Sequence, residues 1–155
     1  MAKIILASDE MEKRAQKIAQ EMGFGAKGMK LAVLGLNKSK EVTKVAKATE
    51  VIEYFSQDQN LILLYIYERA FDKVDEQTQD LWIKIALNKV CYDMEKDKIE
   101  IVDDIRNIIA MHHQYQDVII QKIELGLLTI EQIVEEDKQA KAEAAALKAS
   151  HKKRR

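Results

Sequence analysis

Residues 75–92, DEQTQDLWIKIALNKVCY, contain the pattern on which the predicted fold of this chain depends. Leu81, Ile85 and a residue at 87 or 88 fall on successive turns, which is the apolar spacing of an amphipathic helix. LILLYIY (61–67) precedes this helix and predicts a strand that is buried on both faces, whereas KIEIV (98–102) follows it and predicts a last short strand. The stretch therefore predicts a central helix between two strands.

The N-terminal part of the chain contains two further helix signals. Ser8 or Asp9 can cap the first amides of a helix that we expect to end near Met22, at the glycine-rich loop that follows. Thr49 can cap a second, short helix that ends near Phe55. Both caps are polar side chains at the start of an apolar helical pattern, so they predict where each helix begins.

Two strand patterns lie between these helices. MKLAVLGLN (29–37) is apolar enough for a buried strand, and EVTKVAKA (41–48) is a more polar pattern with β-branched residues. The short turn NKSK (37–40) separates them, so we predict that the two strands form a hairpin. Lys44 and Lys47 lie on the second strand, where lysines commonly protect an exposed sheet edge.

The sequence becomes wholly helical in character after Asp103. It predicts helices over about 104–114 and 116–125, with Gly126 as a C-cap, and a final helix that begins at Thr129. The predicted fold class is α+β, with a small mixed sheet of three to four strands, flanking helices and an all-helical C-terminal extension. The predicted organisation is an α/β body at 1–105, a helical extension at 106–137, and a basic, mobile tail at 138–155.

Composition restricts the possible classes of protein. The 155 residues are 47% hydrophobic and 33% charged, as in an ordinary soluble domain. No stretch approaches the roughly 20 apolar residues that span a bilayer, and the N-terminus has no long apolar run, so we expect a cytoplasmic protein without a membrane partner. The single cysteine, Cys91, is expected to be a small buried hydrophobe in the central helix.

The central helix also carries a resemblance to a known family. The pattern D-E-x-x-x-D-L at 75–81, together with the order strand, helix, charged turn and strand, resembles the phage metallopeptidase family, which consists of small zincin-like proteins. The resemblance covers about residues 10–108. It implies a metallopeptidase-like body and a zinc-binding H-E-x-x-H motif at the place where this chain has Ile85, Ala86, Leu87, Asn88 and Lys89.

The side chains at these positions do not suit zinc chemistry. A zinc hydrolase of this type needs two imidazoles one helical turn apart and a carboxylate that activates the bound water. Ile85 has no donor atom, Ala86 replaces the base, and a protonated Lys89 would repel a cation. The family's third ligand follows the next strand, where this chain offers Asp103 at best. We therefore predict no catalytic residue, no metal ligand and no cofactor.

Three functional hypotheses follow from these observations. The first is a non-enzymatic binding or structural protein of phage or mobile-element origin, acting as a virion or host-takeover protein in the host cytoplasm or virion, on a fold that has lost its zinc site. Its partner, or a second copy, would bind the helices at 104–134. The second is a nucleic-acid-associated regulator. The third is a divergent metal-dependent hydrolase that uses Asp103, His112 or His113 as ligands.

The nucleic-acid hypothesis rests on the uneven distribution of charge. Residues 138–155 hold seven Lys or Arg and one Glu, a net +6, whereas residues 1–137 hold 18 basic and 25 acidic residues, a net −7. Clustered cations neutralise phosphates and release counterions, which gives binding that depends on salt and not on base sequence. The residues predicted to bind nucleic acid or a partner are Lys148, Lys152, Lys153, Arg154 and Arg155.

Overall fold

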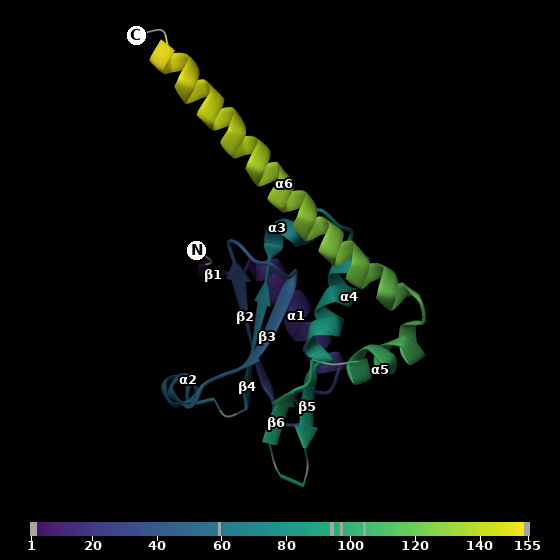
Figure 1. Ribbon diagram of the computed structural model, residues 1–155. Coiled ribbons are helices and arrows are strands. Elements are labelled where there is room, and N and C mark those ends of the chain that lie inside the picture. Colours follow the sequence, from purple (N-terminus) through teal and green to yellow (C-terminus); the bar gives the residue numbers. More distant parts are fainter. Residues whose placement is uncertain (1–2, 59, 94, 97, 104, 154–155) are drawn as a thin grey trace.

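The computed structural model of this chain describes residues 3–58, 60–93, 95–96, 98–103 and 105–153 (Figure 1). The strands are β1 (Ile4–Leu6), β2 (Lys30–Leu36), β3 (Thr43–Lys47), β4 (Leu61–Ile66), β5 (Val90–Asp93) and β6 (Lys98–Ile101). The helices are α1 (Asp9–Glu21), α2 (Glu50–Ser56), α3 (Glu68–Phe71), α4 (Glu76–Leu87), α5 (Ile105–Tyr115) and α6 (Val118–Lys153).

The main sheet has four strands in the order β1-β2-β4-β3. β2 and β4 are parallel, whereas β1 pairs with β2 and β3 pairs with β4 in the antiparallel sense. β5 and β6 form a separate antiparallel pair. This arrangement of a mixed sheet, flanking helices and a long C-terminal helix confirms the predicted α+β fold class.

β4 lies inside the sheet, between β2 and β3. Its side chains Leu61, Ile62, Leu63 and Leu64 are all buried, as the apolar run predicts. The predicted hairpin between β2 and β3 is wrong, because β4 separates these two strands. The more apolar strand takes the position where both edges are hydrogen-bonded, and the lysine-bearing β3 takes an edge, as its lysines suggest.

Helices α1 and α4 pack on one side of the sheet and enclose the main core (Figure 1). The hydroxyl of Ser8 accepts from the Met11 amide at 3.3 Å, which confirms the predicted start of α1. The carboxylate of Asp75 caps α4 by accepting from the Thr78 amide at 2.9 Å. Hydrogen bonds from the side chain and the backbone of Thr78 lower the pKa of Asp75. Arg14 joins the helices by donating to the side chain of Gln79.

The central helix is shorter than the sequence suggests. α4 ends at Leu87, and the next residues form β5, in which Cys91 lies opposite Glu100 of β6. Side chains alternate along a strand, so that Val90 is buried and Cys91 is exposed. The prediction of a buried Cys91 in the helix is therefore wrong, because the local β-branched and aromatic residues at 90–92 form a strand in place of another helical turn.

α6 is one continuous helix of 36 residues, so the predicted break at Gly126 is wrong. Gly126 is inside the helix, where a side chain would meet Val42 and the Trp82 ring, and Thr129 donates its hydroxyl hydrogen to the Leu125 carbonyl within the helix instead of capping a new one. Among the described helices, α6 included, none is long and apolar enough to cross a membrane.

Polar contacts attach the first half of α6 to the body. The indole nitrogen of Trp82 donates to the Lys122 carbonyl at 2.9 Å, and the Lys122 ammonium donates to the Thr78 hydroxyl at 2.8 Å. Glu136 lies two turns beyond Thr129 on α6. Its carboxylate is 2.8 Å from the Lys73 ammonium, which lowers the pKa of Glu136. Arg69 pairs with Asp137 at 2.9 Å, and this hydrogen bond raises the pKa of Arg69.

We expect Gly126→Ala to stabilise the protein by about 0.5–1 kcal/mol, because glycine is a poor residue for a helix interior. The added methyl group would lie 3.5 Å from the Val42 side chain, which is an ordinary van der Waals distance. Thermal unfolding followed by circular dichroism measures the change. Gly126→Leu is the matched control and should lower the melting temperature, because its side chain would push α6 away from Trp82. A lower melting temperature for Gly126→Ala would contradict this packing.

A candidate binding cavity between α4, α6 and the sheet edge

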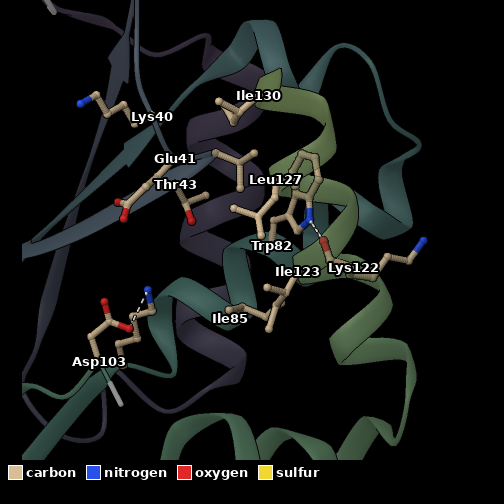
Figure 2. Close-up of a pocket in the computed structure, with 13 residues that line it drawn as sticks. Lys40, Glu41, Thr43, Trp82, Ile85, Asp103, Lys122, Ile123, Leu127 and Ile130 are labelled. Atoms are coloured by element: carbon tan, nitrogen blue, oxygen red, sulfur yellow. Dashed lines mark hydrogen bonds and ion pairs between the residues drawn. The ribbon is translucent and has the colours of Figure 1, made fainter. Parts of the chain in front are cut away.

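A cavity of about 220 Å³ lies between α4, α6 and the segment that leads into β3 (Figure 2). Trp82 and Ile85 of α4 and Ile123, Leu127 and Ile130 of α6 form its apolar side. Figure 2 shows these side chains on the α4 and α6 ribbons, opposite the residues at 40–43. The cavity thus has one wall of large apolar side chains, which is the usual character of a binding site.

The remaining side of the cavity is polar. Lys40, Glu41 and Thr43 extend from the sheet side, and Lys89 lies 3.3 Å from Asp103 in an ion pair. The Asp103 side chain is mostly exposed, so this pair is screened by water and contributes little to stability. It nevertheless places one positive and one negative charge side by side at the cavity margin.

The backbone of β3 offers unpaired groups at the free edge of the sheet. Tyr67 donates its amide hydrogen to the Val42 carbonyl and Ala48 donates to the Leu61 carbonyl, both at 3.0 Å. In an antiparallel ladder these contacts turn the backbone groups of residues 42, 44, 46 and 48 toward β4, and those of Thr43, Val45 and Lys47 away from it. β6 approaches β3 without pairing with it, and within the described part of the chain no strand pairs with this edge.

Thr43 combines both features, because it lines the cavity and has an outward-facing N–H and C=O. An extended segment in the cavity could bond to both groups, as in the addition of a strand to a sheet edge. The cavity is larger than an apolar cavity of about 150 Å³ that holds benzene. One large apolar side chain of a partner therefore fits it.

The structure brings together three of the positions that the sequence singles out. Ile85 and Lys89, at the ligand spacing of the zinc motif, and Asp103, after the following strand, all line this cavity. Ala86 does not line it; its side chain is 1% exposed and belongs to the main core. Among the described residues, no group of three His, Cys, Asp or Glu side chains is arranged to hold a metal ion.

No family model, curated protein or solved structure matches this chain. The resemblance to phage metallopeptidases therefore stays a prediction from the sequence. So do the phage origin and the location in a host cell or virion.

The other predicted site residues lie elsewhere. His112 and His113 are exposed on α5, and the His112 ring lies 3.2 Å from Asp117, next to α6. Lys148 and Lys152 are exposed near the end of α6. The side chain of Lys153, together with Arg154 and Arg155, lies outside the described part of the chain.

Sequence reasoning missed the cavity residues that no motif connects. Leu127 and Ile130 belong to the aliphatic region at 104–134 that predicts a partner surface, and Trp82 is the only tryptophan of the chain. The aliphatic region and the single tryptophan were the sequence signals available for these residues. The turn at 40–43 gave no signal, because its place beside α6 depends on the strand order.

Proposed function

We propose that this chain is a non-enzymatic binding protein that holds an extended, apolar segment of a partner protein in the cavity. The supporting observation is the position of the apolar wall directly beside the unpaired backbone groups of Thr43. Backbone bonds to such an edge supply affinity, and a pocket for one side chain supplies specificity. Leu127 and Ile130, from the region predicted to bind a partner, form part of that wall.

The charged residues of the cavity support a binding role over catalysis. Lys89 and Asp103 pair with each other, so the carboxylate nearest the position of the family's third ligand already has a cation beside it. Ile85 contributes only hydrocarbon to the wall. In this proposal Ile85, Lys89 and Asp103, which stand at the ligand positions of the zinc motif, contact the bound peptide instead.

The proposal is tested with peptides selected on the full chain from a random display library. Selected peptides without tryptophan are titrated against the protein, and Trp82, the single tryptophan, reports occupation of the cavity through its fluorescence. We expect selected peptides to share one large apolar residue. Methylation of the peptide's backbone nitrogen next to this apolar residue should weaken binding, since strand addition uses that N–H group.

Leu127→Lys is the decisive variant, and Leu128→Lys is its matched control. Both leucines are 61% exposed neighbours on α6, but only Leu127 lines the cavity. We expect Leu127→Lys to weaken peptide binding at least about tenfold, which corresponds to 1.4 kcal/mol, and Leu128→Lys to leave it unchanged. Equal effects of the two variants, or a library that yields no binder, would contradict the proposal.

A further inference from the structure

The last part of α6 extends away from the body as a free helical arm, which we define as residues 138–153. Within the described part of the chain, the last ion pairs with the body are those of Glu136 and Asp137, and every described side chain at 138–152 is exposed. Figure 1 shows this segment projecting beyond all other elements. At 1.5 Å per residue the arm is about 24 Å long.

The continuity of α6 arranges four lysines of the arm in a stripe. Lys138, Lys141, Lys148 and Lys152 occupy four of the five positions in a 3-4-3-4 spacing, with Ala145 as the fifth. Residues at this spacing lie on one face of a helix. Glu143, the only acidic residue after Asp137, falls on the opposite face by the same geometry. The arm therefore presents one positively charged face.

The composition of the arm indicates the chemistry of its partner. Leu147 is its only large apolar side chain, so the arm lacks the apolar face with which amphipathic helices enter membranes. It has no Phe, Tyr or Trp, the large aromatic side chains on which the bases of a single strand stack. A row of ammonium groups along one face instead suits the row of phosphates on a duplex.

We propose that the arm binds the phosphate backbone of double-stranded DNA without sequence preference. The lysines bind phosphates and release counterions, while the net charge of −7 on residues 1–137 keeps the body away from the polyanion. The arm separates these two charges in space. A helix about 10–12 Å wide also fits the major groove of B-form DNA, about 12 Å wide, better than the narrow major groove of duplex RNA.

The test is a salt titration of the full chain with a fluorescein-labelled random-sequence DNA duplex, followed by anisotropy. The four lysines of the stripe predict a contribution of about −3 to −4 to the slope of log K against log salt. Neutralising three of them, with Lys141→Gln, Lys148→Gln and Lys152→Gln together, should reduce the slope by about 3 and abolish measurable binding at physiological salt. The control neutralises three exposed body lysines, Lys13, Lys17 and Lys27, and should not weaken binding.

A second variant tests the stripe at constant composition. Lys141→Ala with Ala140→Lys, combined with Lys148→Ala and Ala146→Lys, keeps the net charge and distributes the lysines around the helix. We expect the slope to fall by about half, with an unchanged melting temperature because these side chains are exposed. An unchanged slope would overturn the proposal that the lysine stripe binds the DNA. Tighter binding to duplex RNA, to polyglutamate or to phosphatidylserine vesicles than to the DNA duplex would overturn the proposed partner.

Discussion

Replacing Ala86 by glutamate is expected to destabilise the protein by about 3–5 kcal/mol, because it places an unpaired carboxylate in the core. The Ala86 side chain is 1% exposed and is packed in the main core with Ile83 and Leu87. A loss of this size is a large part of the stability of an ordinary domain, so much of the variant should be unfolded. Urea unfolding followed by circular dichroism measures the difference.

Ile85→His is the matched control for this experiment. Ile85 is only partly buried and lines the cavity, so a histidine can keep its ring nitrogens near water. We expect a smaller loss, about 1–2 kcal/mol. A mild effect of Ala86→Glu, or a loss smaller than that of Ile85→His, would contradict the orientation of α4. In that case residue 86 would face the cavity, as the base of an H-E-x-x-H helix must.

The elements that the sequence predicts best are those with local signals. Ser8 and Thr49 accept the amide hydrogens that their cap patterns predict, and the apolar run of β4 becomes the buried inner strand. These signals are local because a cap hydrogen-bonds within one helical turn, and because a run of apolar residues indicates a buried strand whatever its partners are. α1, α2 and β4 could therefore be placed within a few residues.

Features that depend on distant contacts could not be predicted in this way. The short turn between β2 and β3 suggests a hairpin, yet β4 pairs with both strands from outside that segment. Glycine is a typical residue for a helix end, yet Gly126 packs inside α6 against Val42 and Trp82, which are distant in the sequence. In both cases tertiary packing overrides a local preference.

The candidate site was predictable only in part, for the same reason. The resemblance singled out Ile85, Lys89 and Asp103, and the fold places all three on one cavity. The rest of the lining comes from α6, more than thirty residues beyond α4 along the chain, and from the edge of the sheet. A motif read along one helix cannot reveal which distant segments complete its cavity.

Trp82→Ala is the second change for which we expect a large effect, about 3–5 kcal/mol of lost stability. The Trp82 side chain is 2% exposed, and its ring meets that of Phe71 edge to face with centroids 5.3 Å apart. Its indole nitrogen also donates to the Lys122 carbonyl of α6. The truncation therefore removes core volume, an aromatic contact and the bond between α4 and α6 together.

Because this variant has no tryptophan, its unfolding is followed by circular dichroism, and amide hydrogen exchange reports on α6 separately. Trp82→Phe is the control; it keeps an aromatic ring against Phe71 but lacks the N–H donor, so we expect a smaller loss, about 1–2 kcal/mol. Faster exchange at 118–137 in Trp82→Ala than in Trp82→Phe would show that Trp82 fastens α6 to the body. Wild-type exchange and stability in Trp82→Ala would mean that the ion pairs of Glu136 and Asp137 hold α6 to the body without Trp82.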